Sequence, residues 1–421
     1  MIKQHPLIVL SPVKKDKAEE LDKRLRVIRE SLQQGTETEF KKVPTLHYGR
    51  FVILDRESFR DEPTVPVSTR LIFSTNHDGD KDNHLTEVVT NITNYIDDIY
   101  ECCEGYPGPG SRTTENRKSY LEKYSIKSSA FYNGAPGRSV QQIHQEAALR
   151  DHIWNYIKDN KWGEKASAVD IHRNIRKEID SNPEFEWSKQ MAEVQGIKWF
   201  NFIAYGLLLI AAIPLIIAGA IYLFLFHEIW NKKQTLTLSQ LDDKKVNKLK
   251  EVEDLFPQNQ FTQVAVLKPT FIRRLNFQIW MMRTRVLANN VFVHGKLLNI
   301  PTIHFARWVL IDKNRHVLFF SNFDGNWQQY LGDFIDQSGW GLTGIFSNTV
   351  NFPKTRFMIT GGAYDEEHFL AWSRSTQVPT QVWYCPYPQL SIKNINNNTK
   401  IRNELRKDLN EKQAKIFLKR F

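Results

Sequence analysis

The feature that most constrains the fold of this chain is an internal repeat. Residues 44–55, PTLHYGRFVILD, align without gaps with residues 301–312, PTIHFARWVLID, and six of the twelve positions are identical. Further along, residues 73–79 and 319–325 share Asn, Asp and Gly in register. The two motifs occur in the same order in both halves. A repeat of this kind predicts two similar structural units in one chain.

The pattern around these motifs predicts the same elements twice, in the order βαββαβ of a ferredoxin-like unit. The first helix of each unit has a periodic apolar stripe that is expected to face the core. The stripes are Leu21, Leu25, Ile28 and Leu32 in the first copy and Leu275, Ile279, Met282 and Val286 in the second. Residues 130–133 and 356–360 are the predicted fourth strands, and a short extra strand is expected from Thr380.

We therefore expect an α+β protein with two ferredoxin-like repeats, residues 1–160 and 258–399. Two such units usually pack through their sheets. The expected result is an α/β barrel with helices outside and a ligand cavity between the sheets.

Residues 199–226 form an uncharged run of 28 residues, longer than the ~20 apolar residues that a membrane-spanning helix needs. Pro214 lies near its centre and favours a kink or a turn. The basic flanks show no preferred direction across a membrane, since they are Lys189, Lys198, Lys232 and Lys233. We expect residues 199–230 to form a membrane hairpin that leaves both repeats on the cytoplasmic face. The alternatives are a single span that separates the repeats and a buried core helix.

The 57 lysines and arginines outnumber the 47 acidic residues, and the resulting net charge of +10 suits an anionic partner. The apolar run favours membrane lipid over nucleic acid as that partner. Residues 161–198 are predicted to be an amphipathic linker toward the membrane, and residues 231–257 a second linker. The basic tail, residues 400–421, is predicted to be a helix that either contacts anionic lipid or is solvated. Three cysteines are too few for a disulfide framework, which suits a reducing compartment.

The repeated motifs contain the residues best suited to chemistry. His47 and Arg50 recur as His304 and Arg307. An imidazole serves as acid, base or metal ligand, and a guanidinium binds anionic oxygens. The two side chains of each pair should point to opposite faces of a strand, so that at most one faces a shared cavity. The alternative is that they fix the preceding loop by hydrogen bonds in both halves.

Asp78 and Asp324 lie in the Asn-x-Asp-Gly turns. At the mouth of a barrel either carboxylate is placed to act as an acid or base, with Asn76 or Asn322 as its hydrogen-bond partner. The alternative is ordinary turn chemistry, in which the aspartate caps the helix that follows.

Gly137, Arg138 and Ser139 precede a predicted helix that begins at Val140. A glycine-rich turn at a helix N-terminus binds a phosphate or carboxylate through its free amides, and simple capping by Ser139 is the alternative. Residues 361–365 are the expected equivalent in the second copy. The run CEGYP, which begins at Cys103, occurs only in the first copy, and its cysteine is either part of a site or a small buried hydrophobe.

The duplicated halves and the strings TNHDG and SNFDG resemble, in architecture, the haem-binding α/β-barrel superfamily of dye-decolourising peroxidases and chlorite dismutases. In the peroxidases a G-x-x-D-G motif carries a distal Asp, assisted by an Arg, and a His is the axial haem ligand. Both strings here lack the leading glycine. The strings CEGYPG, FYNGAPGRS and SNFDG are also similar to a family of membrane-associated bacterial proteins described as peroxidase-like. The resemblance implies haem as the cofactor, bound by His304, Arg307 and Asn322.

The sequence thus predicts a membrane-anchored oxidoreductase, dependent on haem or another metal, that acts on a lipid or another hydrophobic small molecule. Its catalytic residues would be His47, Arg50, Asp78, His304, Arg307 and Asp324. The alternative is a non-enzymatic lipid-binding or scaffold protein at the membrane surface. Hydrolysis or transfer of a phosphorylated lipid is a third hypothesis, based on the turn before Val140. Assembly into a homo-oligomer is compatible with each of them.

Overall fold

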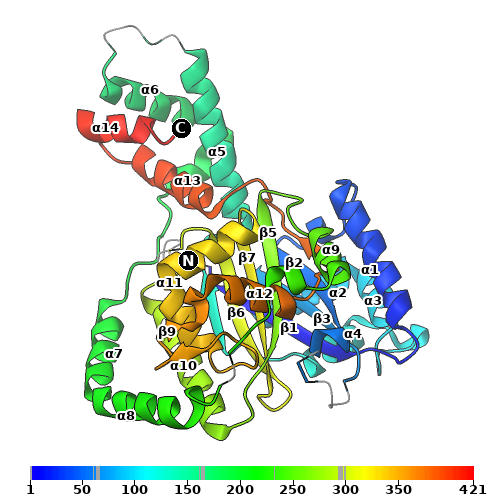
Figure 1. The fold of residues 1–421 in the computed structure, drawn as a ribbon. Coiled ribbons are helices and arrows are strands. Elements are labelled where there is room, and N and C mark those ends of the chain that lie inside the picture. Colours follow the sequence, from blue (N-terminus) through cyan, green and yellow to red (C-terminus); the bar gives the residue numbers. More distant parts are fainter. Residues whose placement is uncertain are drawn as a thin grey trace.

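The computed structural model describes residues 2–59, 61–62, 67–160, 162, 166–231, 233–292, 297 and 300–421. Over these residues the protein is a mixed α/β structure built on two four-stranded antiparallel sheets (Figure 1). The strand order is β1-β3-β2-β10 in the first sheet and β4-β6-β7-β5 in the second. Lys232, one of the lysines that flank the apolar run, lies outside the described residues.

The long strands follow the repeated motifs. In the first sheet the strands are β1 (Gln4–Pro12), β3 (Arg70–Asp78), β2 (Leu46–Leu54) and β10 (Val382–Tyr384). In the second sheet they are β5 (Gln258–Val266), β7 (His316–Asp324), β6 (Ile303–Ile311) and β4 (Ala130–Asn133). The central strands are buried along nearly their whole length, because one face packs on the other sheet and the other face on helices.

Each sheet receives an edge strand from the other half of the chain. β4 pairs with β6, and β10 pairs with β2. The strands predicted at residues 130–133 and from Thr380 are confirmed as β4 and β10. The prediction that residues 130–133 and 356–360 complete the sheets of their own units is wrong. Residues 356–360 instead belong to a separate hairpin formed by β8 (Thr355–Arg356) and β9 (Thr360–Gly361). A sequence pattern identifies a strand but not the strand beside it, so this exchange left no signal in the pattern.

The two sheets pack face to face but do not close into a barrel, since in the described part of the chain they share no strand pairing. Apolar side chains from both sheets fill the space between them, among them Ile8, Val52, Ile72, Val264, Val309, Leu318 and Phe320. The prediction of a closed barrel is wrong, and packed side chains occupy the space where a ligand cavity was expected.

Helices cover the outer faces of both sheets (Figure 1). On the first sheet lie α1 (Ala18–Gln33), α2 (Lys81–Asn91), α3 (Thr93–Tyr100) and α4 (Thr114–Lys123). On the second lie α10 (Phe271–Asn290), α11 (Trp327–Phe346) and α12 (Glu366–Thr376). The predicted linker 231–257 contains a further helix, α9 (Asp243–Lys250).

The stripe predicted to face the core is confirmed on α1 and wrong on α10. Leu21, Leu25 and Ile28 of α1 are buried. On α10 the predicted residues Leu275, Ile279 and Met282 are exposed, whereas the neighbouring row Phe277, Met281 and Ala288 is buried. α10 carries apolar residues on two faces, so periodicity alone could not say which face meets the sheet.

Four helices stand apart from the sheets (Figure 1). They are α5 (Val140–Asp159), α6 (Ala168–Ser181), α13 (Ile392–Leu405) and α14 (Glu411–Leu418). Their own core includes Leu149, Ile153, Ile175, Ile401, Leu405 and Phe417. The tail predicted to contact lipid or solvent is therefore packed within this cluster as part of α13 and α14. The predicted linker 161–198 contributes α6 to the same cluster.

The apolar run forms α7 (Trp199–Ala211) and α8 (Ile213–Leu223), followed by the π-helical turn η5 (Phe224–Glu228). Among the described residues no single helix is long and apolar enough to cross a membrane, although this pair, bent by 59°, meets that criterion when both parts are counted together. The predicted break near Pro214 is confirmed, because the bend falls just before this residue at the start of α8. A bend of 59° does not fold the arms back on each other, so the predicted hairpin is not what the structure shows. We call residues 199–228 the apolar elbow.

Candidate functional site

Each repeated histidine, itself buried, pairs with the aspartate of its own half; Asp78 is buried and Asp324 is partly exposed. His47 Nε2, on β2, lies 3.0 Å from Asp78 Oδ1 at the end of β3. His304 Nε2, on β6, lies 2.7 Å from Asp324 Oδ1 at the end of β7. The pairing of the strands is shifted at both histidines. Such bulges redirect a side chain, which explains how each imidazole reaches the adjacent strand's terminal aspartate.

Each aspartate also binds the first amide of a helix in the separate cluster. Asp78 Oδ2 accepts a hydrogen bond from Val140 N at 2.9 Å, and Asp324 Oδ2 accepts one from Ile392 N at 2.9 Å. A carboxylate is stabilised at a helix N-terminus by the free N–H groups there. The two aspartates therefore fix α5 and α13 to the ends of the sheets. The cap of α2, which follows in sequence, is Asp80 instead.

Gly137, Arg138 and Ser139, the predicted anion site, are engaged within the chain. Gly137 N donates to Gln4 Oε1 at 2.9 Å, and Ser139 caps α5. Arg138 is buried, and its backbone carbonyl accepts from Gln4 Nε2 at 3.0 Å. The anion at this helix N-terminus is thus the protein's own Asp78.

The two halves differ in the turn that precedes the helix. In the second half this turn is residues 385–391, which lead into α13, rather than the predicted residues 361–365. It contributes Tyr387, whose Oη lies 2.6 Å from His47 Nδ1. Asp78 has one donor more than Asp324, because Gln4 Nε2 also donates to Asp78 Oδ1 at 2.7 Å.

Arg50 and Arg307 reach across the space between the sheets. Arg50 donates to two backbone carbonyls of the second sheet and to Asn322 Oδ1. Arg307 donates to two backbone carbonyls of the first sheet and to Asn76 Oδ1 at 2.7 Å. The arginine of each half thus binds the asparagine of the other half's turn motif.

Burial is the main influence on the pKa values of Arg50 and Arg307. It lowers the pKa of Arg50 to about 9 and holds the pKa of Arg307 well below its ordinary value of 12.5, where the charge of Arg50 acts in the same direction. Carbonyl oxygens and the face of Phe320 surround the two guanidinium groups, with Cζ to ring-centroid distances of 5.4 and 5.8 Å. Both arginines therefore act as cross-links between the sheets, and the donors that would hold a substrate anion are already used.

The predicted cofactor residues do not fit a haem in this geometry. Both ring nitrogens of His47 are hydrogen-bonded, and Nε2 of His304 is bonded to Asp324. The cavity beside the two histidines is about 10 Å³, whereas ligand pockets usually hold about 300–1,000 Å³. Arg307 and Asn322 are both buried in the contacts between the sheets. Within the described residues no group of three His, Cys, Asp or Glu is placed to hold a metal ion.

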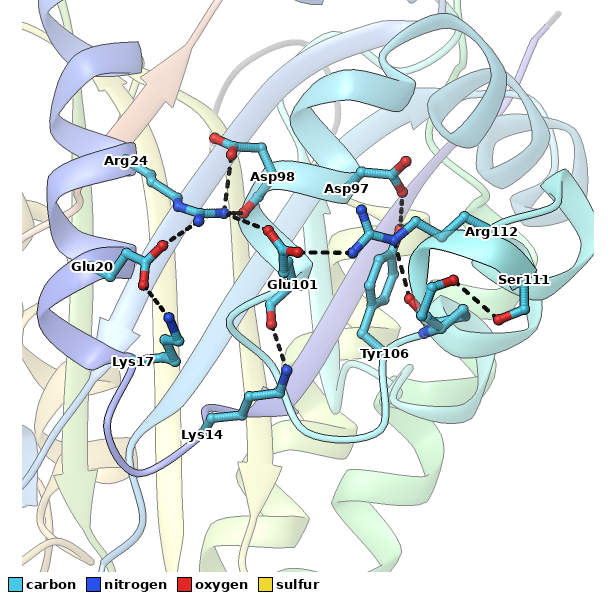
Figure 2. A network of polar contacts seen from close by, with 12 residues as sticks. Lys14, Lys17, Glu20, Arg24, Asp97, Asp98, Glu101, Tyr106, Ser111 and Arg112 are labelled. Carbon is cyan, nitrogen blue, oxygen red and sulfur yellow. Dashed lines mark hydrogen bonds and ion pairs between the residues drawn. The ribbon is translucent and has the colours of Figure 1, made fainter.

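A polar network on the surface fixes the CEGYP loop of the first half (Figure 2). Arg112 pairs with Glu101 at 3.2 Å, and Tyr106 Oη donates to Asp97 Oδ1 at 2.6 Å. Cys103 is fully buried, and burial raises the pKa of its thiol to about 12. Because the thiolate is the reactive form of cysteine, this residue is a poor nucleophile at neutral pH.

A pocket that our sequence reasoning missed lies where the apolar elbow returns to the second sheet. Its volume is about 380 Å³, and its lining includes His227 from η5 and Lys268 and Arg273 around the start of α10. We call it the junction pocket. Arg273 is 1% exposed, yet none of its three guanidinium nitrogens has a hydrogen-bond partner among the residues that the structure describes. No motif marks this pocket, because its basic residues come from segments about forty residues apart in a chain rich in lysine and arginine.

Comparisons of the chain with models of protein families, with curated proteins and with solved structures found no match. The geometry of the described residues therefore carries the functional argument.

Proposed function

We propose that the chain is a non-enzymatic lipid-binding or scaffold protein at the surface of a membrane, attached through the apolar elbow. The observation that carries this proposal is the exposure of its side chains. Phe200 is 84% exposed, Leu208 62% and Leu215 77%, and no residue between 199 and 222 is buried. An exposed apolar surface of this extent marks a contact with lipid or protein. Trp199 and Trp230 lie at its two ends, where indole rings favour the headgroup layer of a bilayer.

The length of each arm favours a position within one leaflet. At about 1.5 Å per residue, the two arms, Trp199–Ala211 and Ile213–Glu228, are roughly 20 and 24 Å long. Each is short of the ~30 Å hydrocarbon core of a bilayer, so neither arm spans it alone.

Both ends of the elbow return to the same body. At the first end Lys198 N donates to Asn290 O at 3.0 Å, and at the second end Glu228 Oε1 accepts from Met358 N at 3.0 Å. The helix between these ends, α10, itself exposes Phe271 and Leu275. These contacts support a monotopic arrangement with both sheets on one side of the bilayer.

The organisation of the sheets supports a gene duplication. We propose that the two halves are ferredoxin-like units whose fourth strands, β4 and β10, have been exchanged. The supporting observations are the repeated His–Asp pairs and the reciprocal bonds of Arg50 with Asn322 and of Arg307 with Asn76.

Vesicle flotation tests membrane attachment. We expect the purified chain to float with phosphatidylcholine vesicles. The double variant Leu208→Asp, Leu215→Asp should remain in the dense fraction, because two carboxylates would enter the apolar layer. The matched control is Val27→Asp, which alters an exposed valine of α1 and should float like the wild type. A wild-type chain that does not float, or a double variant that floats equally well, would contradict the proposal.

Cysteine labelling tests the one-sided arrangement. Glu122 and Glu366 are exposed on opposite halves of the repeat, whereas Cys102 and Cys103 are buried. In sealed right-side-out vesicles, Glu122→Cys and Glu366→Cys should show the same accessibility to an impermeant maleimide. Accessibility of only one of them would mean that the elbow crosses the membrane.

The haem-dependent oxidoreductase stays a prediction, as do the cytoplasmic orientation and the homo-oligomer. An absorption spectrum of the detergent-extracted chain tests the first of these. A Soret band that is lost in His304→Ala would restore the oxidoreductase and displace the binding function proposed above.

A further inference from the structure

We infer that the junction pocket binds a phosphate monoester group, presented by a lipid headgroup or as free phosphate. The lipid source rests on the proposed attachment to a membrane, whereas the phosphate site itself rests on the geometry of the pocket.

Arg273 is the first reason. A guanidinium has five N–H donors, and burying one without acceptors is costly. Arg273 is 1% exposed and lines the pocket, and none of its three guanidinium nitrogens is hydrogen-bonded within the part of the chain that the structure describes. The planar fork of a guanidinium matches the oxygens of a phosphate.

The N-terminus of α10 is the second reason. This helix has 20 residues, and its N-cap residue Thr270 makes no capping hydrogen bond through its side chain. The first amides of a helix lack intrahelical partners, and the helix dipole favours an anion beside them. Thr270 and Arg273 line the same pocket, so the first turn of the helix and the unpartnered arginine lie beside one volume.

The balance of charge is the third reason. Lys268 and His227 line the pocket beside Arg273, and burial together with the charge of Arg273 lowers the pKa of Lys268 to about 7. Glu228 is the nearby acid. Its Oε1 accepts from Thr355 and Met358, whereas its buried Oε2 has no hydrogen-bond partner among the described residues. Burial lowers the pKa of Arg273, and the charge of Glu228 opposes this shift, although no ion pair joins the two in the described part of the chain.

Lys268 Nζ donates to Ser347 O at 2.8 Å and, with the amide of Asn231 in the orientation that satisfies its neighbours, to Asn231 Oδ1 at 3.1 Å. The third proton of a charged Lys268 is left for a ligand. Burial also lowers the pKa of His227. A phosphate in the pocket would favour the protonated forms of Lys268 and His227, because an opposite charge nearby stabilises the cation.

The surroundings of the pocket suit a lipid that carries this group. His227 directly follows Leu225 and Phe226, which are 47% and 63% exposed at the end of the apolar elbow. On the other side of the pocket, Phe271 at the start of α10 is 78% exposed. A headgroup phosphate held by Arg273 would therefore leave its acyl chains beside exposed apolar side chains.

The test compares three kinds of vesicle, made of phosphatidylcholine alone, with a minority of phosphatidic acid, or with the same amount of oleate. Oleate supplies negative charge without phosphate. We expect the full-length wild type to bind the phosphatidic acid vesicles about tenfold more tightly than either of the others. Arg273→Gln should bind all three alike. Arg283→Gln makes the same change on α10 outside the pocket and should keep the preference of the wild type.

The outcomes separate this inference from the proposed function. If the wild type binds no vesicles, membrane attachment fails. The pocket is then tested by thermal unfolding of the wild type and Arg273→Gln with inorganic phosphate as the probe. If the wild type binds all vesicles equally, or if Arg273→Gln keeps the preference, the phosphate site is refuted while attachment stands. Stabilisation of the wild type by inorganic phosphate alone, absent in Arg273→Gln, would identify free phosphate as the ligand; stabilisation by phosphatidic acid alone would identify the lipid.

Discussion

Arg307 and Arg273 are buried to the same extent, at 2% and 1% exposure, and their surroundings are opposite. Arg307 lies between the sheets and donates to two carbonyls and to Asn76. Arg273 lies at the junction pocket and donates to no group that the structure describes. Arg307 has a counterpart in the other half, Arg50, whereas Arg273 lies outside the repeated motifs.

The difference teaches how to separate structural from functional polar residues in this chain. The repeated His, Arg, Asn and Asp residues satisfy one another, and each stabilises the contact between halves or between sheet and helix. Because these residues bond to one another, few of their donors and acceptors are left to bind a substrate. A buried cation that lacks acceptors is costly to keep, so its presence at a pocket points to a ligand that supplies them.

The largest effect is expected from breaking the cross-link between the sheets. Arg307→Met should lower the free energy of unfolding by about 3–5 kcal/mol, because three buried acceptors lose their donor. Arg50→Met should cost a similar amount, since its bonds are reciprocal. Denaturant unfolding of both variants measures the effect. Two variants as stable as the wild type would show that the network is not structural.

A smaller effect is expected at the helix anchors. Burial alone would raise the pKa of Asp78, but hydrogen bonds from His47, Gln4 and Val140 N outweigh it, and the pKa lies below its ordinary value of 3.8. The ionised carboxylate thus stabilises the fold above that pH, and this stability is lost as the pH falls through the folded-state pKa.

Asp78→Asn should therefore cost about 1.5–3 kcal/mol at pH 7 and make stability less dependent on pH below 4. Asp324→Asn should cost about 1 kcal/mol less, because the bond from Gln4 has no equivalent there. Unfolding curves between pH 3 and pH 7 measure both. Equal losses of unfolding free energy in the two variants would contradict the proposed difference between the two anchors.

The helix caps provide a finer test of the repeat. Ser139 accepts from Gln142 N at 3.1 Å, and Ser391 accepts from Asn394 N at 3.1 Å, so each serine caps the helix that its aspartate anchors. Ser139→Ala and Ser391→Ala should each cost about 1 kcal/mol. A loss in one variant only would mean that the two helices are not equivalent in the folded protein.

The smallest effect on stability is expected at Arg273. Without ligand, Arg273→Met removes a buried charge that has no partner, so the free energy of unfolding should stay within about 1 kcal/mol of the wild type or rise. A loss of several kcal/mol would show that Arg273 pairs with Glu228 in solution and holds η5 to α10.

Much of the fold could be predicted from the sequence. The repeat and the period of the apolar residues located the long strands, α1, α5 and the break near Pro214. They could not identify strand partners, because β4 and β10 pair with strands that lie far away in sequence. They also chose the wrong face of α10, which has apolar residues on two sides.

The repeated motifs correctly singled out the residues that meet in the structure, but their roles follow from contacts that the sequence does not contain. The repeat suggests that His47 and Arg50 fix the loop before their strand, but the structure shows both bonded to other segments: His47 to Asp78 and Tyr387, and Arg50 to the second sheet. The bonds of Asp78 with Val140 and of Arg307 with Asn76 depend on distant segments. The junction pocket has no motif, since a buried arginine without a partner becomes visible only once its neighbours are placed.

The most direct test of this account measures unfolding of the wild type, Arg307→Met and Arg273→Met with and without short-chain phosphatidic acid. A ligand that binds only the folded state adds stability in proportion to the logarithm of its concentration. We expect Arg307→Met to start less stable and still be stabilised by the lipid, and Arg273→Met to start as stable as the wild type and gain nothing. Stabilisation of Arg273→Met by the lipid, or its loss in Arg307→Met despite a folded protein, would contradict the account.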